Sequence, residues 1–117
     1  MSEQAVTLSG VAARLAQLSR EMDSLTRALG QLDREAVEKR EAFVLAFAKA
    51  FLAAEGPMDV RRYIATEQTH AERLAAEAAE CSVRDKKAQV KACEASIEVG
   101  RSVGSLVRSE IELDKIR

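Results

Sequence analysis

The sequence has few of the residue types from which active sites are built. Its 117 residues include one His, one Pro, two Cys, three Phe, one Tyr and no Trp. So few aromatic side chains, set against 21 alanines, indicate thin seams between helices rather than a thick globular core. An enclosed catalytic cavity is therefore not expected, and we predict that the protein is not an enzyme.

A surplus of charge and a long apolar run are also lacking. The 18 Lys and Arg residues nearly balance the 19 Asp and Glu residues, for a net charge of -1. Strong non-specific binding to nucleic acid needs clustered positive charge. The uncharged stretch Ala42 to Ala48 is far shorter than the roughly 20 apolar residues that cross a bilayer. The first residues lack the basic and apolar blocks of a secretory signal. We expect no membrane contact and a cytoplasmic protein.

Helix-forming residues are abundant. Ala, Glu, Lys, Leu and Arg account for 64 residues, about 55% of the chain, which is typical of coiled coil when a heptad repeat accompanies it. Apolar residues recur in alternating steps of three and four, at Leu8, Val11, Leu15, Leu18, Met22, Leu25, Leu29, Leu32 and Ala36. This heptad seam predicts a flexible N-terminus over residues 1–7 and a first helix over residues 8–54.

A turn signal follows the first helix. Residues 55–58 contain Gly56 and the single proline, Pro57, and Asp59 is a plausible N-cap for a second helix. The remaining residues, 59–117, read as one helix that only Gly100 and Gly104 threaten to interrupt. The sequence therefore predicts an all-α fold with a single domain over residues 8–117. This domain is a long antiparallel helical hairpin, or coiled coil, that assembles into a homo-oligomeric bundle of the four-helix type.

Two apolar stripes run along the second helix. In an antiparallel hairpin, the residue numbers of two facing residues, one from each helix, add up to a constant. A sum of 113 or 114 places small residues of the second helix opposite the large residues of the heptad seam. We name these residues the first stripe: Ala78, Cys81, Ala88, Ala92, Ala95, Val99 and Leu106. The second stripe comprises Val83, Val90, Cys93, Ile97, Gly100, Gly104, Val107 and Ile111. Because the hairpin partner cannot also cover the second stripe, we expect it to mediate self-association, most simply as a dimer.

The aromatic residues cluster near the turn. Phe43, Phe47 and Phe51 are spaced four residues apart on one helical face, and Tyr63 lies just beyond the turn. In the structural interpretation, the phenylalanines pack on Tyr63 and Ile64 and clamp the turn. In the functional interpretation, Phe43, Phe47, Phe51 and Tyr63 form an apolar tip that docks into a partner.

The His and Cys residues lack the spacing of catalytic and metal-binding sites. His70 and Cys81 lie three helical turns apart, so His and Cys have neither zinc-site spacing nor the contact that a nucleophilic pair requires. Cys81 and Cys93 are too far apart on one helix to form a disulfide, so we expect two reduced packing thiols. Carboxylates on solvated helices have no cavity to perturb them. We predict no catalytic residues, no metal site and no cofactor.

A short basic run offers one further possibility. Arg84, Lys87 and Lys91 share a helical face and are candidates for phosphate contact. Acidic residues are interspersed and no aromatic lies nearby to stack bases, so contact with nucleic acid is the less favoured interpretation.

Two segments carry a resemblance. Residues 43–52, FVLAFAKAFL, and residues 97–102, IEVGRS, resemble segments of small uncharacterised coiled-coil proteins of tailed phages of actinobacteria, over about Ala36 to Glu110. The resemblance implies a small viral accessory protein in the host cytoplasm, and it implies no catalytic residue.

Three functions follow as hypotheses. The first is a non-enzymatic interaction module, an adaptor or inhibitor that binds a host or phage protein. The second is an accessory factor in phage DNA recombination or replication that uses the basic run. The third is a virion structural or assembly protein.

Overall fold

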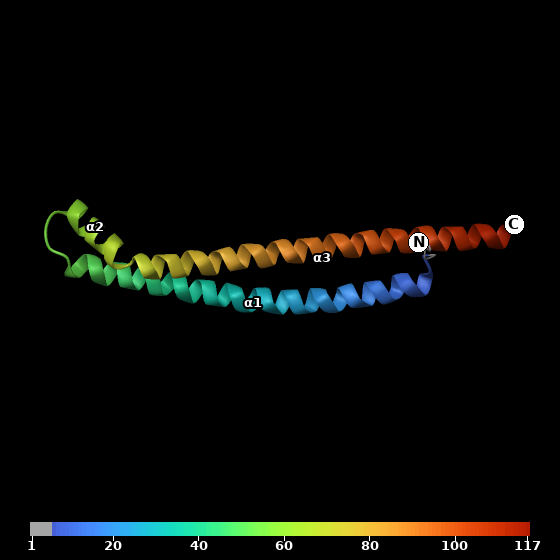
Figure 1. The fold of residues 1–117 in the computed structure, drawn as a ribbon, viewed down its shortest axis with the longest axis horizontal. Helices are drawn as coiled ribbons and strands as arrows, with labels where there is room; N and C mark the ends of the chain where they lie inside the picture. The colour runs from blue at the N-terminus through green and yellow to red at the C-terminus, as the bar shows by residue number, and fades with distance from the viewer. Residues whose placement is uncertain (1–5) are drawn as a thin grey trace, which may run out of the picture. The chain divides into compact units, whose positions relative to one another are not determined.

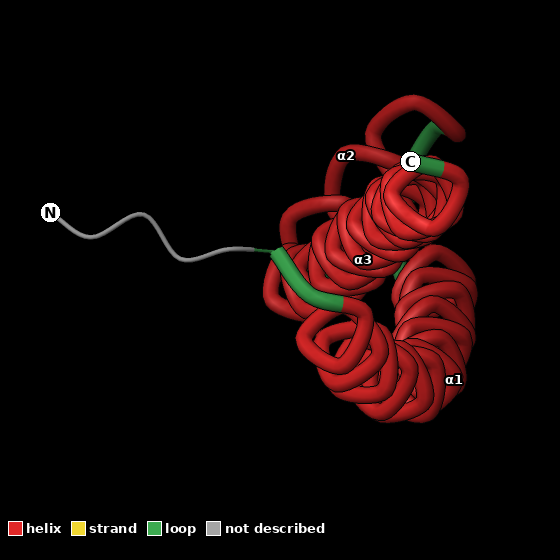
Figure 2. Tube along the Cα trace, turned by 90° about the vertical axis from the view of Figure 1, so that its right-hand side faces the viewer, coloured by secondary structure: helices red, strands yellow, loops and turns green. Residues whose placement is uncertain are grey.

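The computed structural model describes residues 6–117, which form three α-helices and no strand (Figures 1 and 2). The helices are α1 (Leu8–Ala53), α2 (Met58–Gln68) and α3 (His70–Ile116). The predicted all-α helical hairpin is confirmed. Helix α1 ends one residue before the expected boundary, whereas the expected second helix is divided into α2 and α3.

The chain divides into two compact units that share the long helices. The hinge unit comprises Ala28–Lys87, and the terminal unit comprises Met1–Arg27 together with Ala88–Arg117. In each unit, α1 and α3 run antiparallel (Figure 1). In the terminal unit, α3 continues beyond the level at which α1 begins.

The start of α1 is capped by a threonine. Thr7 Oγ1 accepts a hydrogen bond from the backbone N–H of Gly10 at 3.1 Å. This bond satisfies one of the N–H groups that have no partner in the first turn of a helix. The expected flexible segment, residues 1–7, therefore ends in an ordered cap at Thr7, and its residues 1–5 lie outside the described residues.

The turn depends on glycine and on a proline cap. Gly56 adopts a φ of 111°, a conformation that L side chains rarely take. Pro57 occupies the N-cap position of α2, where a missing N–H costs nothing. The expectation that Asp59 is the N-cap is wrong, because Asp59 lies within the first turn of α2. There its carboxylate interacts favourably with the positive end of the helix dipole.

Thr69 separates α2 from α3. Both its backbone N–H and its Oγ1 donate hydrogen bonds to the carbonyl of Ala65, at 3.1 Å and 2.7 Å. A threonine hydroxyl that bonds to the carbonyl four residues earlier bends a helix. Thr69 is buried, and α3 begins at the next residue. A mid-helix threonine carries no signal in the sequence that distinguishes this break from an uninterrupted helix.

The predicted seam on α1 is the buried face of that helix. Leu18 and Ala36 are buried, and the seam residues between Val11 and Leu32 are otherwise half-buried. Leu8 sits at the end of the seam and is exposed. After Ala36, the next residue of α1 that faces α3 is Arg40, which is half-buried, whereas Lys39 is exposed.

The assignment of the two stripes on α3 is reversed. Every residue of the first stripe is exposed, including Val99 at 63% and Leu106 at 67%. The second stripe faces α1 instead: Val83, Cys93 and Gly104 are buried, and Val90, Ile97, Gly100 and Val107 are half-buried. The premise that the second stripe is left uncovered for self-association is therefore wrong for these residues. Ile111 alone of the second stripe is exposed, because it lies beyond the start of α1.

Apolar area explains the reversal. The first stripe consists mainly of alanines, whereas the second contains Val and Ile, and full burial of each such side chain contributes about 1.5–3 kcal/mol. Contacts in the terminal unit place Gly100 against Leu15 and Gly104 against Val11, so facing residue numbers sum to 115 rather than 113 or 114. This small change in register turns the other face of α3 toward α1.

The two glycines of α3 allow this close approach. A Cβ at Gly100 would lie 2.8 Å from Leu15 Cδ2, and a Cβ at Gly104 would lie 3.3 Å from Val11 Cγ1. Helix α3 nevertheless remains continuous through both positions to Ile116. The glycines therefore serve packing between the helices, and they do not end α3.

Candidate interaction surfaces

The phenylalanines form an inward ladder in the hinge unit. The ring centroids of Phe43 and Phe47 are 6.2 Å apart in an edge-to-face arrangement, and those of Phe47 and Phe51 are 6.4 Å apart and stacked. All three side chains are half-buried. Tyr63 is 70% exposed, so the aromatic set does not form one surface.

Two arginines fix the phenylalanine ladder at its ends. The Arg40 guanidinium lies 5.5 Å from the centroid of Phe43, and that of Arg61 lies 4.6 Å from the centroid of Phe51. Both distances permit a cation–π interaction. Arg61 also donates hydrogen bonds from Nε and Nη2 to the Phe51 carbonyl, at 3.2 Å and 3.0 Å. That carbonyl belongs to the last turn of α1, where carbonyls lack intrahelical donors, so Arg61 joins α2 to the end of α1.

An ion pair between Arg40 and Glu80 joins α1 to α3 in the hinge unit. The Nη2 and Nε atoms of Arg40 lie 2.7 Å and 2.8 Å from Oε1 of Glu80. Both side chains are about a third exposed, so solvent reduces the strength of the pair. The pair fixes how α3 faces α1 at the point where the heptad seam of α1 reaches Arg40.

An exposed apolar stripe lies on α1 beside the phenylalanine ladder. We name it the α1 stripe; it comprises Val37, Val44, Leu45 and Leu52, which are 53% to 74% exposed. Val37 and Val44 each follow an inward residue, Ala36 and Phe43, by one position. In the hinge unit α1 therefore has an apolar surface wide enough for two neighbours. Sequence reasoning missed this surface, although the seven-residue repeat of Val37 and Val44 was a signal for it.

Helix α2 adds a smaller surface. A shallow depression of about 260 Å³ is lined by Tyr63, Thr66, Glu67 and His70. His70 Nδ1 lies 3.0 Å from Nη2 of Arg73, in an exposed contact within one helix. The depression therefore lies on the outer face of α2 and the start of α3, with Tyr63 as its one aromatic side chain.

The two cysteines occupy different environments. Cys93 is buried, and its Sγ lies 3.5 Å from the carbonyl oxygen of Leu18. Cys81 is exposed, so the expectation that it is a packing thiol facing the seam of α1 is wrong. Both are free thiols. Across residues 6–117, no group of three or more His, Cys, Asp or Glu side chains is placed to hold a metal ion.

The basic residues Arg84, Lys87 and Lys91 are all exposed on α3. Asp85 is exposed among them, so one acidic side chain interrupts the basic run. Arg84 and Lys87 belong to the hinge unit, and Lys91 belongs to the terminal unit.

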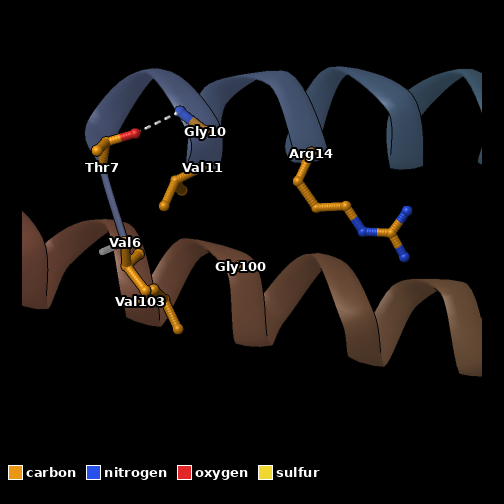
Figure 3. Close-up of a pocket in the computed structure, with 7 residues that line it drawn as sticks. All are labelled: Val6, Thr7, Gly10, Val11, Arg14, Gly100 and Val103. Atoms are coloured by element: carbon orange, nitrogen blue, oxygen red, sulfur yellow. Dashed lines mark hydrogen bonds between the residues drawn. The ribbon is translucent and has the colours of Figure 1, made fainter. Parts of the chain in front are cut away.

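A groove runs beside the helix pair of the terminal unit. Its outer part, about 440 Å³, is lined by Val6, Thr7, Gly10, Val11, Arg14, Gly100 and Val103 (Figure 3). An adjoining part of about 390 Å³ is lined by Arg14, Leu18, Ala95, Ser96, Val99 and Gly100. Figure 3 shows Val11 reaching from α1 toward α3, with Arg14 further along α1. Two glycines, Gly10 and Gly100, line the outer part of this groove.

Comparisons with protein-family models, curated proteins and solved structures gave no match to this chain.

Within residues 6–117, no helix combines the length and the apolar character that crossing a membrane requires.

Proposed function

We propose that this chain is a non-enzymatic coiled-coil protein-interaction module that binds another protein through the α1 stripe. The observation that carries the proposal is the exposure of four large apolar side chains on one stretch of α1. Contiguous exposed apolar residues mark interaction sites in monomeric proteins. The phenylalanine ladder and its two arginines lie along the neighbouring face of α1.

The spacing of the stripe suits a helical partner. Val37 and Leu52 are fifteen residues apart, which corresponds to about 22 Å along a helix. An amphipathic partner helix of about four turns would cover this length with residues at i, i+3, i+4 and i+7. The role proposed for the complex is the adaptor or inhibitor role, in a phage-infected cell, that the sequence resemblance implies.

Matched variants of α1 test the proposal. Val44→Glu with Leu52→Glu places two charges in the stripe, whereas Ala42→Glu with Ala53→Glu places two charges on exposed alanines outside the stripe. Each buried Val or Leu contributes about 1.5–3 kcal/mol, so the first pair should weaken binding at least 100-fold. The alanine pair should leave binding unchanged.

The assay is capture of partners from bacterial lysate by each tagged protein, with and without nuclease, followed by quantitative mass spectrometry. We expect a stoichiometric protein that survives nuclease, is lost with the stripe variant and is retained with the alanine variant. Equal capture by all three proteins would contradict the role of the stripe. Capture that disappears with nuclease would favour nucleic-acid binding by Arg84, Lys87 and Lys91.

A further inference from the structure

The terminal unit buries little apolar surface of its own. Among its described residues, Leu18, Cys93 and Gly104 are the buried ones, and no large side chain in residues 6–117 is fully buried. The whole chain, both units together, exposes 8904 Å². A compact globule of 12.8 kDa would expose about 6,300 Å², so the excess over the whole chain is about 2,600 Å². Each partner contributes about 800 Å² to a standard interface, which is about a third of this excess.

The two flanks of α3 in the terminal unit differ in chemistry. One flank borders the groove and is exposed without a formal charge over five helical turns: Ala88, Ala92, Ala95, Ser96, Val99, Ser102 and Leu106. The opposite flank is exposed and charged: Lys91, Glu94, Glu98, Arg101 and Arg108. The charged flank is suited to solvent, and the uncharged flank is suited to a close helix neighbour.

The uncharged flank is complementary to itself. Val99 lies at its centre, with Ala92 seven residues before and Leu106 seven residues after. In an antiparallel pair of identical helices related by a two-fold axis at Val99, each Leu106 faces the Ala92 of the other copy. Large side chains then fit opposite small ones, in two symmetric places.

We propose that a second copy of this chain occupies the groove, with the two α3 helices antiparallel across a two-fold axis at Val99. The uncharged flank of each α3 lies against that of the other copy. This site is separate from the α1 stripe and uses a different unit, so either proposal can fail without the other. The interface also differs from the second stripe, which the chain covers with its own α1.

Light scattering on the full chain tests self-association with matched lysine variants. Val99→Lys with Leu106→Lys adds two positive charges to the uncharged flank, and Ser105→Lys with Ser109→Lys adds the same two charges at exposed serines outside that flank. We expect twice 12.8 kDa for the native chain and the control. We expect a helical monomer for the Val99 and Leu106 variant, with at least 100-fold weaker association.

Disulfide trapping tests the orientation. In a Cys81→Ser background, one chain carries Ala92→Cys and another carries Leu106→Cys. Mild oxidation of the mixture should give a covalent heterodimer, and either chain alone should give at least tenfold less product. The proposal would be overturned if the native chain were monomeric or if the serine control dissociated as much as the Val99 and Leu106 variant. It would also be overturned if homodimer disulfides were as abundant as the mixed product.

Discussion

Close packing at Gly100 decides whether a Gly100→Ala substitution raises or lowers the free energy of unfolding. A Cβ at this position would lie 2.8 Å from Leu15 Cδ2, about 0.7 Å inside the contact distance of carbon atoms. At Gly30, the nearest atom to an added Cβ is Nη1 of Arg34, at 3.8 Å, which is an ordinary contact. Gly30→Ala and Gly100→Ala therefore make the same chemical change in different surroundings.

The magnitudes decide the expected outcome. Replacing a mid-helix glycine with alanine stabilises a helix by about 0.8–1.0 kcal/mol. Overpacking costs about 1–3 kcal/mol. Gly30→Ala should thus raise the free energy of unfolding by about 1 kcal/mol, and Gly100→Ala should leave it unchanged or lower it by up to about 2 kcal/mol. The two variants should differ by about 1–3 kcal/mol, which corresponds to several degrees in Tm.

Leu15→Ala supplies the control, because it removes the methyl group that the new Cβ would meet. In that background Gly100→Ala should stabilise the chain by about 1 kcal/mol. Thermal and urea unfolding, followed by circular dichroism at one protein concentration, measure all the variants. The reasoning is refuted if Gly100→Ala stabilises the native chain as much as Gly30→Ala does, or if its effect is equal with and without Leu15.

Further predictions concern contacts in both units. Val83→Ala should lower the free energy of unfolding by about 1–3 kcal/mol, because Val83 is buried against α1. Urea unfolding measures this change, and an unchanged free energy of unfolding would mean that Val83 is exposed. Arg40→Ala and Glu80→Ala should couple by about 0.5–1 kcal/mol in a double-mutant cycle, and a coupling of zero would mean that this partly exposed ion pair does not contribute. Thr7→Ala should cost about 1 kcal/mol through loss of the cap, with faster hydrogen exchange in the first turn of α1; unchanged exchange there would contradict this role.

The sequence allowed the hairpin and the buried face of α1 to be predicted, because its large apolar residues at heptad spacing define a single face of α1 that can be buried. It did not determine the face of α3. Both stripes of α3 have heptad spacing, and each gives a nearly constant sum with the seam of α1. The choice depended on the greater apolar area of the second stripe and on the space that Gly100 leaves for Leu15.

The candidate site was predicted only in part. The aromatic cluster near the turn was recognised, but its members point inward or stand apart, and the exposed surface is the neighbouring α1 stripe. Arg61 was not foreseen as a partner of the Phe51 carbonyl, because a contact between α2 and the last turn of α1 depends on the path of the loop. The break at Thr69 could not be predicted either, because Thr26 and Thr66 make the same hydrogen bond to the carbonyl four residues earlier without ending a helix.

The surfaces left for partners depend on which stripe of α3 faces α1, and the two native cysteines report this directly. Cys81 belongs to the first stripe and Cys93 to the second. Labelling of the unmodified native chain with a thiol reagent, followed by peptide mapping, measures both rates in one sample. The structure predicts that Cys81 reacts at the rate of an exposed thiol and that Cys93 reacts at least tenfold more slowly. Labelling of Cys93 as fast as or faster than Cys81 would contradict the assignment of the two faces.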